Sequence, residues 1–308
     1  MSENSEVSEL ERPAPNCYSA ATMDNRSHID EFESMFKRAQ REPFTYADVP
    51  IHSIALVTDG NRADAQSLSE SLATFLPSLP LTDDPRLICA DDYANVGQLL
   101  EQINQQQTDL IVTYRHLQEE SLVPQHSLGV YVDVLTQATS IPVLLLPGTA
   151  AHPISLTGKN CQRVMMVTDH ISGDNRLINY GVRMCVAGGT VWLCHVEDDL
   201  AFERYMNAIE RIPEIESDQA RRLIDEQLLK DASDFIQTCI EELRARGPNI
   251  SYHSGVSRGH HLKEYRKLVD DHEIDLLVAN TKDEDQLAMH GITYSLSVQL
   301  LDVAMLLL

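Results

Sequence analysis

The segment IALVTDGN, residues 54–61, has a counterpart farther along the chain in VMMVTDHI, residues 164–171. In each copy, a short run of apolar residues ends on Val-Thr-Asp and is followed by a helical apolar pattern. Continuous apolar runs of this kind are typical of parallel strands that are buried on both faces, and such strands are joined by crossover helices. The segment therefore predicts a parallel α/β fold in which one β-α unit occurs twice.

Two further landmarks follow in the same order in both copies. DLIV, residues 109–112, corresponds to DLLV, residues 275–278. Gly129 corresponds to Gly291, and each glycine precedes a helical pattern and a last apolar strand. Three landmarks in one order favour an internal repeat over chance similarity between two α/β segments.

The repeat predicts two tandem domains, residues 51–150 and residues 160–308. Residues 1–27 are acidic and polar with few large apolar groups, so we expect a flexible tail there. Residues 28–50 are expected to form an N-terminal helix and a linker. The apolar residues at helical spacing in that segment are Ile29, Phe32, Met35 and Phe36.

The second copy is longer than the first between its landmarks. The first copy runs from Asp59 to Asp109 between the Val-Thr-Asp segment and the next apolar run, and the second runs from Asp169 to Asp275. The added block holds a predicted strand, residues 190–199, and a long helical pattern, so the first copy lacks one β-α unit. Whether residues 86–92 take the place of the second or of the third strand stays open.

The added block has one helical apolar stripe that we expect to cover the sheet. A protein-binding surface is the alternative for its first part, which contains Tyr205, Met206, Ile209 and Ile212. The residues of the stripe are Leu223, Leu228, Ala232, Phe235, Cys239 and Leu243.

Composition limits the classes of partner. The 308 residues are 43% apolar, which is enough for a core in each domain, and 47 acidic against 24 basic residues give a net charge of −23. Such a charge repels polyanions, so nucleic acid and anionic membrane surfaces are excluded as expected partners. No stretch reaches the roughly 20 apolar residues of a membrane span, and the start lacks the pattern of a secretory signal. We therefore expect a cytoplasmic protein.

The pattern of cysteines also indicates the cytoplasm. They are scattered without a CxxC pair, and most lie in apolar runs, so we expect reduced, buried thiols and no disulfide or zinc site. The six cysteines are Cys17, Cys89, Cys161, Cys185, Cys194 and Cys239.

The order strand-VTDG-helix, then DLIV, then Gly-helix-PVLLLP resembles the universal stress protein domain, over most of residues 50–308 as two copies. The resemblance implies two tandem parallel-sheet domains of the adenine nucleotide α-hydrolase type, with the first copy shortened. In that family the Asp that closes the first strand lies beside the nucleotide, and Asp59 and Asp169 match it, each after a threonine, Thr58 and Thr168.

Nucleotide-binding members of the family carry Gly-x2-Gly-x9-Gly-(Ser/Thr) after the fourth strand. In the first copy the two leading glycines fall on Tyr114 and Leu117, and only Gly129 remains, with Val130 where a hydroxyl is expected. Side chains at the leading positions block the close approach of backbone amides to phosphate.

The second copy departs from the motif in the same way. Its leading glycines fall on Asn280 and Asp283, and Gly291 remains, followed by Ile292. Asp283 also adds negative charge where phosphate would lie. We therefore expect no resident cofactor, with ATP or AMP as the alternative ligand at a vestigial site. The residues of that vestigial site are Thr58, Asp59, Gly129, Thr168, Asp169 and Gly291.

Other polar groups do not form a recognisable catalytic or metal-binding set. Neither GxSxG nor a GxxxxGK(S/T) loop occurs. His260 and His261 are expected to begin a solvated helix, and Arg115 and His116 are expected to lie at the surface. Cys194 and His195 are neighbours on a predicted strand, so their side chains face opposite sides and do not share a metal.

The last strand of each copy is strongly apolar, as VLLL in residues 143–146 and as residues 303–308. An exposed apolar edge of this kind favours aggregation, so we expect the two strands to pair within the chain as an internal pseudo-dimer. The favoured function is a non-catalytic stress-response or regulatory module that acts through protein partners or self-association. The alternatives are an adenine-nucleotide sensor or slow ATPase that uses Asp59 or Asp169, and an unrelated α/β enzyme.

Overall fold

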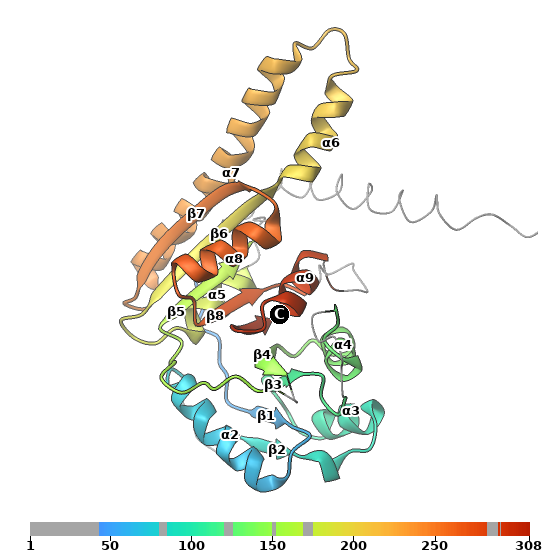
Figure 1. The fold of residues 1–308 in the computed structure, drawn as a ribbon. Helices are drawn as coiled ribbons and strands as arrows, with labels where there is room; N and C mark the ends of the chain where they lie inside the picture. The colour runs from blue at the N-terminus through green and yellow to red at the C-terminus, as the bar shows by residue number, and fades with distance from the viewer. Residues whose placement is uncertain are drawn as a thin grey trace, which may run out of the picture. The chain divides into compact units, whose positions relative to one another are not determined.

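The apolar runs of the sequence form the strands of one sheet in a computed structural model (Figure 1). The chain divides into two compact units, Met1–Arg41 and Glu42–Leu308, and all described residues belong to the second unit. The tail and the helix expected before residue 42 lie outside the described residues. The structure describes residues 43–79, 85–119, 126–149, 152–168, 175–281, 289 and 291–308.

Within the described residues the sheet has nine strands in the order β2-β1-β3-β4-β9-β8-β5-β6-β7. All neighbouring strands are parallel except β4 and β9. The α/β fold with a mostly parallel sheet is thereby confirmed. The strands are β1 (Ile54–Val57), β2 (Arg86–Ile88), β3 (Leu110–Arg115), β4 (Val143–Thr149), β5 (Arg163–Val167), β6 (Thr190–Asp198), β7 (Ser251–Gly259), β8 (Leu276–Ala279) and β9 (Ala304–Leu307).

The two halves of the sheet have matching strand orders. β5 lies between β6 and β8 in the second half, and β1 lies between β2 and β3 in the first half. In the second half β7 pairs with the outer side of β6, whereas β2 has no described strand on its outer side. Residues 86–88 therefore take the place of the second strand, and among the described residues of the first half the third strand has no counterpart.

The last strands of the two halves lie side by side at the centre of the sheet. Val143 is opposite Leu307, Leu144 is opposite Leu306, and β4 runs antiparallel to β9. Both strands are buried along their whole length. The apolar strand of each half is thus covered on its open side by the other half, which leaves β2 and β7 as the edges of the sheet.

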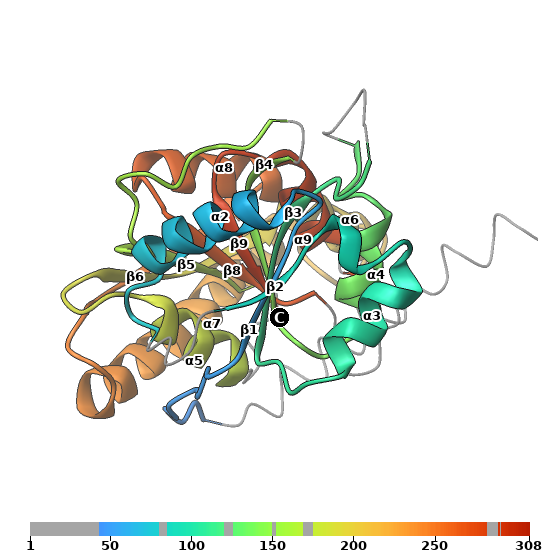
Figure 2. The ribbon, with the colours of Figure 1, turned by 90° about the horizontal axis from the view of Figure 1, so that it is seen from below.

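Helices cover both faces of the sheet (Figure 2). Successive strand residues point to opposite faces, so Ile54 and Leu56 enter the core beneath α2, α5 and α7, and Ala55 and Val57 enter the core beneath α3, α4, α8 and α9. No helix among the described residues is long and apolar enough to cross a membrane. The helices are α2 (Arg62–Phe75), α3 (Val96–Asn104), α4 (Val130–Ala138), α5 (Asn175–Met184), α6 (Asp199–Ile209), α7 (Ser217–Arg246), α8 (His261–Asp271) and α9 (Gly291–Gln299), with a 3-10 turn at Ala90–Asp92.

The long helix α7 covers the sheet with its C-terminal part only. Its buried residues begin at Ala232 and continue to Leu243, and they pack against the core beneath α2 and α5. Leu223, expected on the same buried stripe, is 50% exposed, so that part of the prediction is wrong. The reason is length: the N-terminal part of α7 extends with α6 past the ends of β6 and β7, where there is no sheet to cover (Figure 1).

Candidate functional site

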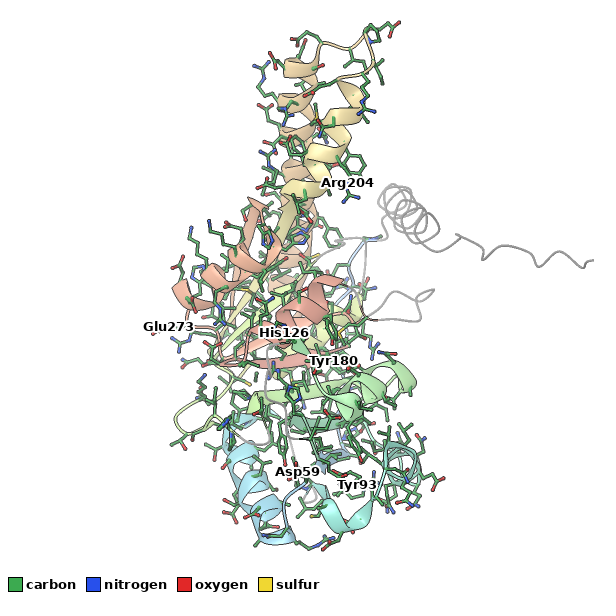
Figure 3. The ribbon with its side chains drawn as sticks, turned by 45° about the vertical axis from the view of Figure 1, so that its right-hand side comes forward. Asp59, Tyr93, His126, Tyr180, Arg204 and Glu273 are labelled. Atoms are coloured by element: carbon green, nitrogen blue, oxygen red, sulfur yellow. The ribbon has the colours of Figure 1, made fainter. Side chains whose placement is uncertain are left out.

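The predicted site residues of the first half lie where β1 and β3 end. Parallel strands place their carboxyl ends at one edge of a sheet, and ligands of open α/β sheets bind at that edge. Thr58 and Asp59 follow β1, and Tyr114 is the second-last residue of β3. Figure 3 shows Asp59 and Tyr93 at this edge, and the Tyr93 hydroxyl donates a hydrogen bond to the Thr58 carbonyl at 3.2 Å.

Tyr114 occupies one oxygen of the Asp59 carboxylate. Its hydroxyl donates to Asp59 Oδ1 and accepts the backbone N–H of Asp59 at 3.0 Å. The same hydroxyl lies 2.6 Å from Thr58 Oγ1, and because its proton points to Asp59, the threonine is the donor of that bond. Burial raises the pKa of Tyr114 to about 12, with the hydrogen bond to Asp59 as a further cause, so the phenol stays protonated at neutral pH.

The loop after β3 occupies the other oxygen of Asp59. The backbone N–H of Gln118 donates to Asp59 Oδ2 at 2.9 Å. His116 and Gln118 both have a positive φ, 58° and 55°, which is a conformation that glycine adopts more readily than other residues. The loop thus makes the backbone turn without the two leading glycines, and it folds back onto Asp59 instead of leaving that carboxylate open.

A carboxylate of the same loop lies at the start of α4. Glu119 Oε1 accepts the backbone N–H of Val130 at 2.8 Å. The N-terminus of a helix presents unpaired N–H groups and a partial positive charge, and it is therefore a favourable place for an anion. In this protein the anion is the side chain of Glu119, which comes from the loop that precedes the helix.

Gly129 is required by this arrangement. It has a φ of 90° as the N-cap of α4, and a Cβ at this position would lie 2.9 Å from Glu119 Oε2 and 2.9 Å from His116 Cα. Any other residue would be strained and would displace the loop. Gly129 therefore has a structural reason to be kept whether or not a phosphate binds.

Tyr131 and Tyr93 lie next to the loop at Gln118. Tyr131 donates its hydroxyl proton to Gln118 Oε1 at 2.8 Å, and the ring of Tyr131 meets the ring of Tyr93 edge-on at 5.8 Å. These groups fix the Gln118 side chain over the loop. The loop after β3 is thus hydrogen-bonded to Asp59 and to Val130, the residue that follows Gly129. Neither Gln118 nor Glu119 was among the predicted site residues.

The prediction that Arg115 and His116 lie at the surface is wrong. Arg115 has no exposed surface, and His116 is 2% exposed. The Arg115 guanidinium donates to the carbonyls of Ser297 at 2.6 Å, Leu146 at 3.1 Å and Leu300 at 3.1 Å. The last carbonyls of a helix have no partner within the helix, so an arginine at the end of α9 satisfies groups that would otherwise be buried and unpaired.

Arg115 consequently joins the two halves of the chain. It belongs to β3 of the first half, and two of its acceptors belong to the last turn of α9 and the residue beyond it in the second half. Burial lowers the pKa of the guanidinium to about 10, so the group still carries its charge at neutral pH. No local pattern signals this role, because the two acceptors of the second half lie far along the chain from β3.

The second half has a different set of groups at the same edge. Asp169 and Asp283 lie outside the described residues. Thr168 is buried, and its hydroxyl donates to the Cys194 carbonyl at 2.5 Å. Its carbonyl lies 2.6 Å from His195 Nδ1, and His195 Nε2 lies 3.1 Å from Glu197 Oε2.

The two contacts of His195 determine how many protons the imidazole and the Glu197 carboxyl group hold together. A carbonyl can only accept, so Nδ1 must donate to Thr168 and carry a proton. The second contact then needs one more proton, placed on Nε2 or on the Glu197 carboxyl group. Glu197 was not among the predicted site residues, although its position two residues after His195 on β6 places both side chains on one face.

Gly291 differs from Gly129 in its surroundings. It is the first residue of α9, and a Cβ added there would meet no atom of the described residues within 4 Å. Asn280, which replaces a glycine of the motif, accepts the Thr293 hydroxyl through its carbonyl at 2.7 Å. Within the described part of the second half no hydrogen bond joins Thr168 to Gly291.

The described residues contain no group of three or more His, Cys, Asp or Glu side chains that could hold a metal ion. His260 is exposed at the start of α8, and His261 Nε2 lies 2.8 Å from the Val196 carbonyl. The five described cysteines are free and buried. Burial raises the pKa of Cys185 and of Cys194 to about 12, so these thiols are not poised for chemistry at neutral pH.

Comparisons with known proteins concern the fold alone. No protein-family model and no curated protein sequence matches the chain. The chain is similar to a universal stress protein from Archaeoglobus fulgidus, with 12% identity, a TM-score of 0.46 and coverage of 83% of this chain and 85% of that one. It is also similar to a functionally unknown protein from Pseudomonas aeruginosa, with 10% identity, a TM-score of 0.44 and coverage of 96% and 89%. At these values no conclusion about ligands rests on the similarities.

Proposed function

We propose that this chain is a non-catalytic stress-response or regulatory module of the universal stress protein type, which acts in the cytoplasm through protein contacts. In its first half, the chain's own side chains take the place that a nucleotide would need. The observation that carries the proposal is the Glu119 carboxylate on the first N–H group of α4, next to an Asp59 whose two oxygens are both hydrogen-bonded.

Two energetic terms oppose a phosphate at this place. A phosphate charge about 4 Å from the Glu119 carboxylate would cost roughly 1 to 4 kcal/mol, depending on the effective dielectric constant. Displacing the carboxylate from Val130 would lose a charged hydrogen bond of about 1.5 to 3 kcal/mol. The first term applies if the carboxylate stays and the second if it is displaced, and each 1.4 kcal/mol is a factor of about ten, so affinity falls by roughly five- to thousandfold.

A second candidate function is adenine-nucleotide sensing in the second half. It is favoured by the surroundings of Gly291, where no described side chain takes the position that Glu119 takes beside Gly129. In that case the nucleotide would meet the start of α9, and the first half would serve only as the partner of the second.

Titration calorimetry and thermal unfolding with ATP and AMP separate the two candidates. A ligand at 100 times its dissociation constant adds about 2.7 kcal/mol to the free energy of unfolding. For the non-catalytic module we expect no binding heat and no rise in melting temperature at 1 mM nucleotide. Saturable binding that Gly291→Glu abolishes would instead establish the second candidate, because that change places a carboxylate at the start of α9.

A further inference from the structure

Residues 43–51 form an extended segment without helix or strand, and we call this segment the strap. The strap leads into β1 of the first half, yet its hydrogen bonds go to α5 and α7 of the second half (Figure 1). We propose that the face of α5 that binds the strap is a binding site for an extended segment of a partner protein, and that the strap occupies this site in cis. The proposal rests on the proposed function only in that it names how a protein contact is made.

Polar side chains of α5 bind the backbone of the strap at regular steps. Asn175 Oδ1 accepts the backbone N–H of Thr45 at 3.0 Å. Asn179 accepts the backbone N–H of Ala47 at 3.2 Å and donates to the carbonyl of Thr45 at 3.4 Å. Two asparagines one helical turn apart thus hold two residues of the strap that are two positions apart.

Arg183 continues this series along α5. It donates to the carbonyl of Val49 at 3.0 Å, and it follows Asn179 by four residues, as Asn179 follows Asn175. Residues at this spacing lie on one face of a helix. Four helical residues rise about 6 Å, and two residues of extended chain span about 6.6 Å. This face of α5 therefore matches the step of an extended chain, and because it binds backbone groups, its contacts do not require one particular sequence.

Side-chain specificity comes from an aromatic anchor. Phe44 is 6% exposed and packs in the core beneath α2, α5 and α7, and Tyr46 packs against the same core. The backbone N–H of Tyr46 donates to Glu242 of α7 at 3.4 Å, so the strap contacts both helices. In extended-peptide recognition, main-chain hydrogen bonds supply affinity and pockets for alternate side chains supply specificity. The expected partner segment therefore carries an aromatic residue at the position of Phe44.

The sequence of the strap favours the extended conformation before it binds. Pro43 and Pro50 lie near its two ends. Proline fixes its own φ and disfavours the helical conformation of the residue before it. A segment that is already extended loses less conformational entropy on binding.

The strap has the features of a segment that opens without unfolding of the sheet. No backbone–backbone hydrogen bond joins residues 43–51 to other residues of the described chain. Segments with few buried contacts open locally at a low free-energy cost. The exposed residues of the strap are Pro43, Thr45, Ala47, Asp48 and Pro50.

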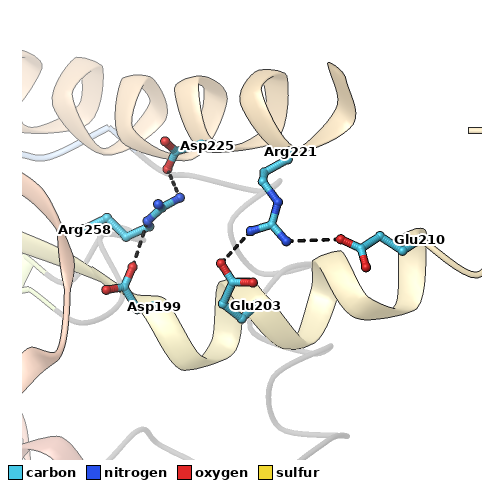
Figure 4. Close-up of polar contacts among 6 residues, drawn as sticks. All are labelled: Asp199, Glu203, Glu210, Arg221, Asp225 and Arg258. Carbon is cyan, nitrogen blue, oxygen red and sulfur yellow. Dashed lines mark hydrogen bonds and ion pairs between the residues drawn. The ribbon is translucent and has the colours of Figure 1, made fainter. Parts of the chain in front are cut away.

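The contacts that join α6 to α7 and β7 differ in kind from those of the strap. Arg258 bonds Asp225 at 2.6 Å, and Arg221 bonds Glu203 at 2.5 Å (Figure 4). Hydrogen bonds between two charged groups are shorter and stronger than bonds to neutral groups. The strap makes no ion pair with the described residues, and its hydrogen bonds measure 3.0 to 3.4 Å.

In the intact chain the strap competes with a partner segment. Its short tether to β1 gives it an effective concentration on the order of millimolar. A partner segment binds only those molecules in which the strap has opened, so its apparent affinity is reduced by that fraction. A change that removes the anchor of the strap should therefore raise the affinity for a segment supplied in trans.

Fluorescence anisotropy with a labelled peptide of residues 43–52 tests the proposal on the full chain. We expect Phe44→Asp to bind this peptide at least tenfold more tightly than the unmodified chain, with far-UV circular dichroism as the check of the fold. Thr45→Asp is the matched control, because the Thr45 side chain is exposed, and it should bind like the unmodified chain. Asn179→Ala, added to the Phe44→Asp chain, should weaken binding at least tenfold because it removes two backbone contacts.

Hydrogen exchange of the unmodified chain tests the opening of the strap even if Phe44→Asp does not fold. Mass spectrometry compares the amides of the strap with those of β1. We expect protection of the strap to be at least a hundredfold lower, because the strap opens while the sheet stays folded.

Three results would overturn the proposal. The first is a folded Phe44→Asp chain that does not bind the peptide. The second is binding that Asn179→Ala leaves unchanged, which would place the peptide on another surface. The third is a strap whose amides are as well protected as those of β1. These measurements contain no nucleotide, so such a failure would leave the account of Glu119 and Asp59 unaffected.

Discussion

Replacing Arg115 by methionine tests whether the two halves of the chain depend on one buried cation. Methionine keeps an unbranched apolar stem and removes the guanidinium. The change leaves the carbonyls of Leu146, Ser297 and Leu300 without the donors that now lie 2.6 to 3.1 Å away.

The size of the effect follows from these contacts. A buried carbonyl that loses its partner costs about 1 to 3 kcal/mol, which for three carbonyls gives about 3 to 9 kcal/mol. Removing the guanidinium also removes its own desolvation cost, which offsets part of that loss. We therefore expect Arg115→Met to lower the free energy of unfolding by about 3 to 5 kcal/mol, a large fraction of the 5 to 15 kcal/mol typical of folded proteins.

Urea unfolding followed by fluorescence measures the loss. Trp192 is the only tryptophan of the chain, and it is stacked between His253 and His272 in the second half. Two of the three acceptors lie in the second half, so a lowered midpoint at Trp192 would show that this half loses stability when the guanidinium of β3 is removed. Arg62→Met is the control, since Arg62 is exposed and only 3.3 Å from Asp92, and it should cost less than about 1 kcal/mol.

The reasoning about Arg115 would be refuted by one clear outcome. If the free energies of unfolding of Arg115→Met and Arg62→Met differ by less than about 1 kcal/mol, the buried guanidinium is not what holds the end of α9 against β3 and β4.

Three further changes have outcomes that the structure determines. Burial raises the pKa of Asp133, with the charge of Glu119 as a second cause, so the folded state keeps this proton after the unfolded state has lost it and stability falls as the pH rises through that interval. Asp133→Asn should therefore raise the melting temperature at pH 7 but not near pH 3, and an equal effect at both pH values would count against it. The thiols of Cys185, Cys194 and Cys239 have a pKa raised to about 12 by burial, so iodoacetamide at pH 8 should label them only after unfolding, as peptide mass spectrometry would detect. Deleting residues 303–308 removes β9 and uncovers β4, so the shortened chain should aggregate on size-exclusion chromatography, and a soluble monomer with an unchanged spectrum would contradict the role of this pairing.

The parts of the fold that the sequence predicted are those that depend on local pattern. Continuous apolar runs predicted β1, β5 and β8, because strands buried on both faces need apolar residues at every position. The identity of the missing strand could not be read in the same way. β2 has only three residues, and its place beside β1 is set by pairing between Ala55 and Arg86, which no local pattern encodes.

The site was predicted in its positions but not in its contacts. The sequence placed Asp59 and Gly129 at one edge and showed that Tyr114 replaces a glycine. It could not show that the Tyr114 hydroxyl reaches Asp59, or that Glu119 accepts from Val130, because both contacts depend on the path of the loop after β3. Arg115 was misplaced for a related reason. A charged residue after a strand is usually solvated, and only the packing of α9 against β3 and β4 gives it buried acceptors.

The central claim is that the Glu119 carboxylate takes the place of an anion at the start of α4. Equilibrium dialysis of triphosphate and ATP against the unmodified chain and Glu119→Gln tests it most directly, since glutamine keeps the shape and the acceptor but removes the charge. The account predicts no measurable binding by the unmodified chain at 1 mM and a roughly five- to thousandfold higher affinity in the variant, from a repulsion of roughly 1 to 4 kcal/mol. Equal affinities in the two proteins, or micromolar binding of ATP by the unmodified chain beside Asp59 and Gly129, would contradict it.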